Sequence, residues 1–231
     1  MRRTLILLSL LLTAVLLAGT VRALLVTQYV VTATDAPDLL PGDRVLVNRV
    51  AYGLRLPGDR WWGPRRLGNG RAEEGDYIAF YDPQGYGPED RRPVRVGQVL
   101  AAPGDTLWLD PARRSLLPAR TTTDARPVPI PAAGTLVDVT PWTARLLWRT
   151  LRQHEHRPAV LVGDTALRLG GRLLRRVRVR QDYYWTEGSA QAGLVPASSL
   201  VGRAFCVSYS LDPAQPFGRR WRSDRCLSLL P

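Results

Sequence analysis

The longest run of apolar residues lies at the N-terminal end of the chain. Residues 4–21 contain no charged side chain, and Arg2 and Arg3 come directly before them. As a helix that rises about 1.5 Å per residue, this run would be about 27 Å long, close to the roughly 30 Å hydrocarbon core of a bilayer. The pattern predicts a transmembrane helix over residues 1–24 with its N-terminus in the cytoplasm. A cleaved signal peptide is the alternative, because Ala18-Gly19-Thr20 is acceptable as a small-residue cleavage site.

Beyond this run the pattern becomes the alternation of polar and apolar positions that is typical of β-strands. Residues 23–34 are rich in Val and Thr, and residues 44–50 and 75–83 alternate between the two kinds of side chain. Turn signals that contain Gly and Pro separate these segments. The pattern therefore predicts a mainly β body after the apolar run.

One helix is predicted within the body. Thr140-Pro141 provides an N-cap residue followed by proline at the first helical position, and the apolar residues behind it recur at helical spacing. The helix should end near His156. His154 and His156 stand two residues apart and therefore face different sides of a helix, so we expect solvated histidines and no metal site.

A hairpin is predicted after this helix. Residues 161–179 have the pattern of two short strands, with turns at Gly163-Asp164 and Gly170-Gly171. The arginines between Arg172 and Arg180 alternate with apolar residues and should form the solvated face of the hairpin.

The charged residues and the cysteines argue against nucleic-acid binding and against metal or cofactor binding. The formal net charge is +12, and all 32 Lys and Arg residues are Arg, so the chain contains no lysine. These arginines are spread along the chain and form no basic block, so we expect no nucleic-acid partner. Cys206 and Cys226 are too few for a disulfide framework and lack metal-ligand spacing, so no metal or cofactor is expected. A single bridge between them remains open in an oxidising compartment.

A segment behind the apolar run contains the sequence Thr34-Asp35-Ala36-Pro37-Asp38-Leu39-Leu40-Pro41-Gly42-Asp43. It resembles the active-site segment of the bacterial type I signal peptidases (leader peptidases), whose motif reads Ser-Met-x-Pro-Thr-Leu-x-x-Gly-Asp. Alignment on Pro37 and on Gly42-Asp43 places Thr34 where the family has its nucleophilic serine. Asp35 takes the place of the methionine, and Asp38 takes the place of the threonine.

Further boxes follow in the order of the family, so that the resemblance extends from residue 4 to about residue 212. Gly75-Asp76 opens the next strand, and Pro103-Gly104-Asp105 matches the end of the box that carries the family's general-base lysine. Counting back from this turn places Gly97 at the position of that lysine. Residues 183–185 and 194–196 flank a position where the family's Gly-Asp-Asn-Arg core is shortened to a few small residues.

The resemblance implies an architecture and a location. The fold would be a mainly β, antiparallel coiled sheet with a variable α+β insert over about residues 108–180. Residues 25–231 would lie on the periplasmic side of the inner membrane, held by the single helix. Membrane lipid, the signal peptides of secreted preproteins and an active paralogue are the implied partners. The substrate groove would be lined by Asp35, Ala36, Pro37, Val99 and Leu100.

The resemblance also implies a chemistry for which one group is missing. In the family a serine attacks the peptide bond while a buried, neutral lysine takes its proton. Deprotonation of an arginine at neutral pH would cost about 5.5 pKa units, or about 7.5 kcal/mol, so arginine cannot replace that lysine. We therefore expect a non-catalytic homologue that binds extended preprotein segments or an active paralogue. The alternative is an active signal peptidase that uses Thr34 and an unidentified base.

Overall fold

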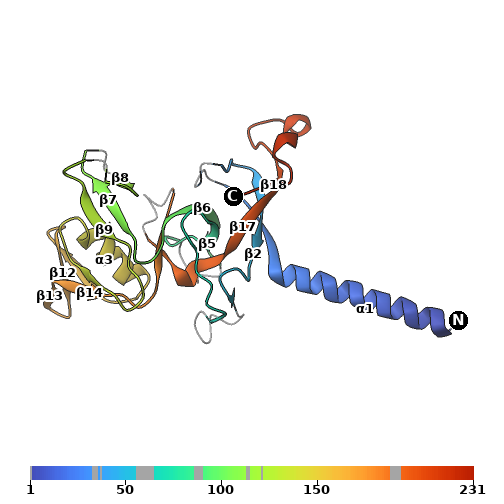
Figure 1. Cartoon of the computed structure of the whole chain (residues 1–231), viewed down its shortest axis with the longest axis horizontal. Helices are drawn as coiled ribbons and strands as arrows, with labels where there is room; N and C mark the ends of the chain where they lie inside the picture. Colours follow the sequence, from blue (N-terminus) through green and yellow to red (C-terminus); the bar gives the residue numbers. More distant parts are fainter. Residues whose placement is uncertain are drawn as a thin grey trace.

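The computed structural model describes residues 2–32, 36, 38–55, 65–85, 91–112, 115–120, 122–187 and 194–231. A long helix projects from one end of a curved sheet, and a second lobe lies at the other end of that sheet (Figure 1). All of the strand pairings among the described residues, in the main sheet and in the small sheets, are antiparallel. The predicted mainly β, antiparallel fold is therefore confirmed.

Helix α1 (Arg2–Leu25) is the projecting helix. Its described side chains are those of residues 6–19 and of Leu25, and the large apolar side chains of residues 6–19 are more than half exposed. Among the residues that the structure describes, no helix is both long enough and apolar enough to cross a membrane. The predicted transmembrane anchor is therefore not supported.

The main sheet contains eight strands, which come from widely separated parts of the chain. Seven of them follow one another in space in this order: β1 (Val26–Val30), β2 (Asp43–Asn48), β17 (Leu200–Ser210), β5 (Tyr77–Tyr81), β6 (Val94–Ala101), β15 (Tyr183–Thr186) and β16 (Val195–Pro196). The eighth, β18 (Ser228–Leu229), pairs with β17 off this path. Chain segments near residues 45, 80, 100 and 205 thus share one sheet.

Apolar side chains cover both faces of this sheet. On β5, Tyr77 and Ala79 point to one face, and Ile78 and Phe80 point to the other, as expected for a strand buried on both sides. The first face carries the motif-loop cluster, made of Val31, Ala36, Leu39, Val45, Val47, Tyr77, Ala79, Val96, Val201, Ala204 and Val207. The second face carries the far-face cluster, made of Tyr52, Ala72, Ile78, Phe80, Val99, Tyr184, Val195 and Leu200.

Three small sheets and one helix make up the second lobe, and a short hairpin flanks the main sheet. The hairpin is β3 (Leu54–Arg55) with β4 (Arg66–Leu67). The lobe contains β7 (Thr106–Asp110), β8 (Ser115–Leu117), β9 (Arg126–Pro129), β10 (Leu136–Asp138), α3 (Ala144–Gln153), β11 (Ala159–Val162), β12 (Ala166–Leu169), β13 (Arg172–Leu174) and β14 (Arg176–Arg178). Its core lies under α3 and continues into the main sheet through Ala101 of β6 and through Tyr183 and Trp185 of β15. Short 3-10 turns, η2 (Ala197–Ser199), η3 (Phe217–Arg219) and η4 (Ser223–Arg225), complete the described chain.

Helix α3 begins three residues later than predicted. Thr140 acts as a cap, because its hydroxyl accepts from the Thr143 amide at 3.2 Å, while the Thr143 hydroxyl accepts from the Thr140 amide at 2.9 Å. This reciprocal pair closes a turn over residues 140–143, and the regular helix starts at Ala144. The helix ends at Gln153, close to the predicted end.

The segment after α3 forms four short strands instead of the predicted two. β12 pairs with both β11 and β13, whereas β14 leaves this sheet and pairs with β10. The predicted turns are present: Gly163, Asp164, Gly170 and Gly171 all have positive φ. The arginines of β13 and β14 are exposed, so the prediction of a solvated basic face is confirmed.

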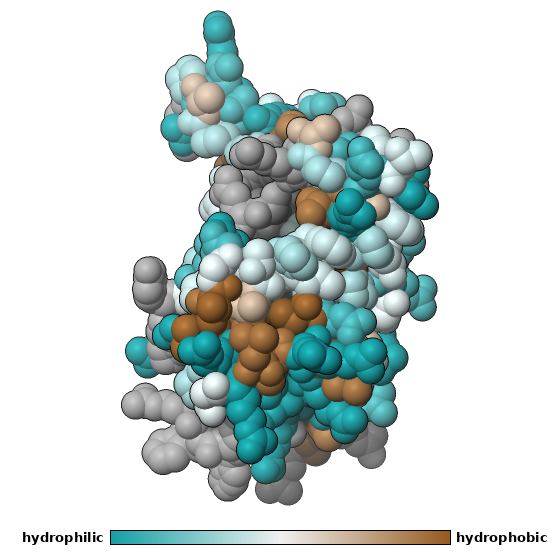
Figure 2. Space-filling model, turned by 90° about the vertical axis from the view of Figure 1, so that its left-hand side faces the viewer, coloured by the Kyte–Doolittle hydropathy of each residue, from teal (hydrophilic) through white to brown (hydrophobic). Residues whose placement is uncertain are grey.

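One surface of the second lobe carries apolar side chains among basic ones. Val160 and Leu173 are more than half exposed and lie on either side of Arg168 in the paired strands. Figure 2 shows the apolar patch on this end of the molecule, with hydrophilic residues around it. Residues 108–180 contain 14 of the arginines and 5 of the acidic residues, so they contribute +9 of the net charge of +12.

His154 is not the solvated histidine that the sequence suggested. It lies at the C-terminal end of α3, where its ring faces the ring of Tyr183 with centroids 6.0 Å apart. Burial, which is the largest cause, together with Arg92 and His156 lowers the pKa of His154 to about 4. His156, in contrast, is exposed.

This burial predicts a pH-dependent stability. Below the ordinary histidine pKa of 6.5 the unfolded chain takes up a proton at His154, but the folded chain does not until about pH 4. The free energy of unfolding should therefore fall as the pH drops from about 7 to about 5, by about 1–2 kcal/mol from this residue. His154→Gln should remove this part of the loss in urea unfolding, and the matched control His156→Gln should keep it. An equal pH dependence in both variants would contradict the assignment.

Candidate functional site

Three Gly-Asp boxes of the sequence form the same local structure. In each, glycine takes a positive φ, and the aspartate carboxylate accepts from the amide three residues earlier: Leu40 to Asp43 at 2.9 Å, Glu73 to Asp76 at 3.1 Å and Ala102 to Asp105 at 2.7 Å. The aspartate amide donates back to the carbonyl of that earlier residue. Positive φ at the third position is the requirement of a type II turn, which only glycine meets without strain.

The first of these turns holds the motif loop, by which we mean residues 36 and 38–42. Gly42 has no room for a side chain, because a Cβ there would lie 1.8 Å from the carbonyl oxygen of Leu211. Its amide donates to Val31, and the Val31 amide donates to Asp43. The loop is therefore fastened to the end of β1 on one side and to the end of β17 on the other.

Asp43 differs from the other two aspartates because it is fully buried, and it is paired with an arginine there. Asp76 also pairs with an arginine, Arg203, at 3.1 Å, but it keeps some solvent contact. Arg225 Nη2 donates to its Oδ2 at 2.6 Å, and Nε donates to its Oδ1 at 3.2 Å. Burial by itself would raise the pKa of Asp43, but the hydrogen bonds from Arg225, from the Leu40 amide and from Ser210 outweigh it and lower the pKa. Asp43 thus remains an anion inside the protein.

Arg225 also reaches the motif loop directly. The same Nη2 donates to the backbone carbonyl of Asp38, and the neighbouring Arg222 donates to the carbonyl of Pro41 at 3.1 Å. Neither arginine was recognised as a site residue from the sequence, because both lie about 180 residues further along the chain. The only available signal was the basic and aromatic composition of residues 212–226.

A second polar contact lies on the motif-loop face of the sheet. The hydroxyl of Tyr77, on β5, donates to Asp38 Oδ2 at 2.5 Å. Burial raises the pKa of Tyr77 above its usual range, and Asp38 and Glu187 raise it further. Tyr77 and Glu187 were not recognised as site residues from the sequence, although Tyr77 directly follows the Gly75-Asp76 box.

The structure places the predicted catalytic and groove residues as follows. Thr34, Asp35 and Pro37 lie outside the described residues. Gly97 is buried on β6 opposite Ile78, so by alternation it shares the face of the far-face cluster, while Val96 faces the motif-loop cluster. Ala36 is buried in the motif-loop cluster, Val99 in the far-face cluster, and Leu100 packs against the core of the second lobe. These three predicted groove residues therefore do not share one cluster.

The cysteine bridge that the sequence left open is not formed. Cys206 and Cys226 are both free thiols, and they contact the carbonyls of Val207 and Arg222 respectively. The reason is the register of β17 and β18, which places Leu229 opposite Cys206. Cys226 lies three residues earlier, outside this ladder.

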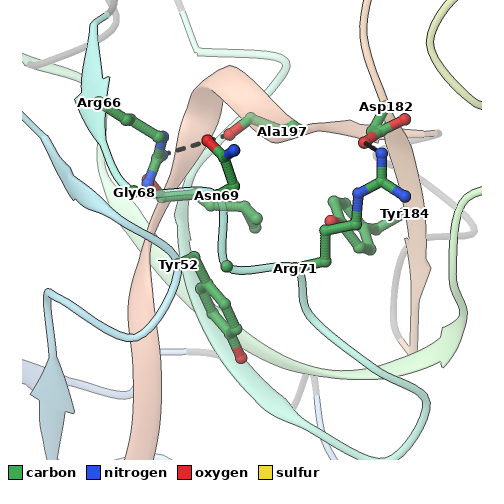
Figure 3. A pocket seen from close by; sticks show the side chains of 10 residues that line it. Tyr52, Arg66, Gly68, Asn69, Arg71, Asp182, Tyr184 and Ala197 are labelled. Atoms are coloured by element: carbon green, nitrogen blue, oxygen red, sulfur yellow. Dashed lines mark hydrogen bonds and ion pairs between the residues drawn. The ribbon is translucent and has the colours of Figure 1, made fainter.

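A cavity of about 230 Å³ lies on the far face, between the β4 region and η2 (Figure 3). Its cations already have partners within the protein. Arg66 donates to the carbonyls of Ala197, Ser198 and Leu200, and Arg71 forms an ion pair with Asp182 at 3.3 Å. These contacts fasten the β3–β4 hairpin to β17 and give the cavity a structural role. Among the described residues, no group of three or more His, Cys, Asp or Glu could hold a metal ion.

Comparison with known families agrees with the geometry of the Gly-Asp turns. Residues 4–113 match the family described as signal peptidase, peptidase S26, and they include all three turns and position 97. The match covers 110 of the 231 residues and confirms the resemblance to the signal peptidases over that part of the chain. No curated protein matches the chain closely enough to be reported.

The buried pair of Asp43 and Arg225 predicts unequal effects of equal substitutions. Asp43→Asn leaves Arg225 without its anion and should lower the free energy of unfolding by about 3 kcal/mol. Asp105→Asn changes the same turn geometry at an exposed position and should cost less than about 1 kcal/mol. Urea unfolding of both variants at neutral pH makes the comparison. Equal losses would mean that the turn, and not the ion pair, stabilises the loop.

Proposed function

We propose that this protein binds extended apolar segments of secreted preproteins beside the motif loop and does not cleave them. The family that residues 4–113 match acts on preproteins that carry signal peptides, so substrates of this kind are the natural partners. The observation that carries the proposal is the position of the family's base, which is occupied by a buried glycine in a chain without lysine.

The described polar groups near the motif loop support this reading. General base catalysis needs a group with a pKa near the working pH. Here the shifts move away from neutrality: the pKa of Tyr77 is raised, that of Asp43 is lowered, and hydrogen bonding to Asp43 raises the pKa of Arg225. These three groups therefore stabilise the loop and are poorly suited to take a proton from a nucleophile.

The motif loop has the properties of a binding surface. Leu40 is 38% exposed, and the backbone around it is fixed by Asp43 and by the arginines of the C-terminal region. Strand addition to a sheet derives its affinity from main-chain hydrogen bonds and from side-chain pockets. A rigid loop beside the edge of β17, where only the two-residue strand β18 is paired, meets both needs without any catalytic group.

Helix α1 suggests where the protein works. A helix that exposes leucines on every side would cost free energy in water, and contact with the acyl chains of lipid would remove that cost. We therefore place α1 in contact with a lipid bilayer and the remaining residues on its extracytoplasmic side, in keeping with the family.

The absence of cleavage is directly testable. Incubation of the purified protein with a preprotein in detergent should give no cleavage, either for the unmodified chain or for Thr34→Ala, while an intact family peptidase cleaves in parallel. Turnover by the unmodified chain that is lost in Thr34→Ala would establish an active enzyme and overturn the proposal.

Binding is measured with a fluorescein-labelled peptide that carries the apolar segment of a signal peptide. Leu40→Arg should weaken this binding at least about tenfold, because it places a charge where the peptide is expected to pack. The matched control is Leu136→Arg, which introduces the same charge at an exposed leucine of the second lobe and should leave binding unchanged.

The lipid contact of α1 is tested by flotation with vesicles of neutral lipid. The unmodified chain should rise with the vesicles, and Leu11→Arg combined with Leu12→Arg should reduce the bound fraction several-fold, because both leucines are exposed on α1. Leu173→Arg, at a leucine of similar exposure on the second lobe, serves as the control. Equal flotation of all three proteins would exclude α1 as the lipid contact.

A further inference from the structure

The segment that contains β18 completes the sheet beside the motif loop. Cys206 lies opposite Leu229, and Val207 lies opposite Ser228. The Leu230 amide donates to Phe205 at 3.0 Å, and the Leu227 amide donates to Ser208 at 3.3 Å. On the same side of β17, the pairing with β5 ends at Arg203. β18 thus covers a part of the β17 edge that β5 leaves free.

The covering strand is short and makes little apolar contact. It contains two paired residues, and the side chains of Leu227 and Leu229 are 75% and 77% exposed. Leu227 has a φ of 55°, a left-handed conformation that is unfavourable for leucine. Leu230 is the exception, because it packs partly against the motif-loop cluster. Little burial would be lost if this strand left the edge.

A cavity of about 340 Å³ separates the strand from the motif loop. It is lined by Asp38 and Leu40 of the loop, by Val207 of β17, and by Arg225 and residues 228–231. The lining combines apolar side chains with one carboxylate and one guanidinium, both of which are held by hydrogen bonds to the protein. A longer strand on β17 would have space here for a side chain that β18 does not supply.

We propose that the edge of β17 at residues 205–208, which β18 now covers, is a docking edge for an extended, uncharged apolar peptide, and that residues 227–230 compete with this peptide for it. The present occupant indicates the chemistry that the edge accepts, since residues 227–230 are neutral and mostly apolar and Ser228–Leu229 is extended. This inference rests on the proposed peptide-binding function, for which it names the edge and the internal competitor.

Arg225 determines which residues of the C-terminal segment the peptide could displace from β17. Its ion pair with Asp43 and its contact with Asp38 hold η4 against the motif loop. Residues after Arg225 can therefore leave β17 while the loop stays in place. Displacement of β18 would expose the edge without disturbing the turn on which the motif depends.

The register of β17 and β18 allows the two strands to be joined by a reversible disulfide. Because the Leu230 amide donates to Phe205, Cys206 and Leu229 form a non-hydrogen-bonded pair, whose Cα atoms lie about 4.5 Å apart in antiparallel sheets. This spacing is within the range of a disulfide. Leu229→Cys in a Cys226→Ser background should therefore form a bridge to Cys206 under oxidation and release it under reduction. Leu229→Ser in the same background is the matched control.

The labelled signal-peptide segment described above is titrated against both proteins, oxidised and reduced, after thiol titration has established the state of the bridge. The Leu229→Cys protein should bind the peptide at least tenfold more weakly when oxidised than when reduced. The Leu229→Ser control should bind the peptide equally in both states. Equal binding by the oxidised and reduced forms of the Leu229→Cys protein would overturn the proposed competition at β17 and leave the proposed peptide-binding function unaffected. No binding by any form would overturn both.

A second variant tests the competition without a disulfide. Leu230→Ser removes the main apolar anchor of the segment and should raise the affinity for the same peptide several-fold. The peptide should also accelerate hydrogen exchange at the amides of Leu227 and Leu230, which donate to β17 in the resting protein. Unchanged affinity together with unchanged exchange would show that the peptide does not use this edge.

Discussion

The buried ion pair of Asp43 and Arg225 is the interaction on which the rest of the site depends. A carboxylate without solvent contact is tolerated only when its charge and its lone pairs are satisfied, and Asp43 has Arg225, the Leu40 amide and Ser210 for this purpose. The partners come from the motif loop, from the end of β17 and from η4. One anion thereby joins segments that are about 180 residues apart, and it makes the conformation of the motif loop conditional on the C-terminal part of the chain.

The local elements of this arrangement could be predicted from the sequence. The Gly-Asp boxes specify their turns through requirements of the backbone alone, namely a positive φ at glycine and a carboxylate that accepts from the amide three residues earlier. The alternation in β2 and β5 likewise reports burial on the faces of a sheet. Such signals are contained within a few residues, and they were sufficient for the mainly β fold.

What could not be predicted depends on contacts between distant segments. Arg225 is one arginine among many, and only the folded chain shows which carboxylate it meets. His154 has the spacing of a surface histidine, but the packing of Tyr183 against it determines its burial. The pairing of β14 with β10, and the register that separates Cys206 from Cys226, are also choices between competing partners for a strand. Local propensity does not rank such alternatives.

The motif loop has a fixed turn geometry, and position 97, where the resemblance to the signal peptidases places a lysine, is a buried glycine. The three turns and the buried anion hold the loop in one conformation. Under the proposed binding function this rigidity would favour recognition, because a preorganised surface loses less conformational entropy on binding than a mobile one. Family membership and chemical activity are separate properties of a chain, and the residue at position 97 bears on the second alone.

The junction between α1 and β1 has a mechanical consequence. The helix ends at Leu25 and the strand begins at Val26 with no residue between them, and the Arg49 amide clamps the junction by donating to Leu25 at 2.8 Å. A torque applied to the helix would therefore pass into the sheet without being absorbed by a hinge. The length of the strand also limits the distance between the helix and the motif loop. At about 3.3 Å per residue, the five steps from Val26 to Val31 place Val31, to which the Gly42 amide donates, at most about 17 Å from the end of the helix.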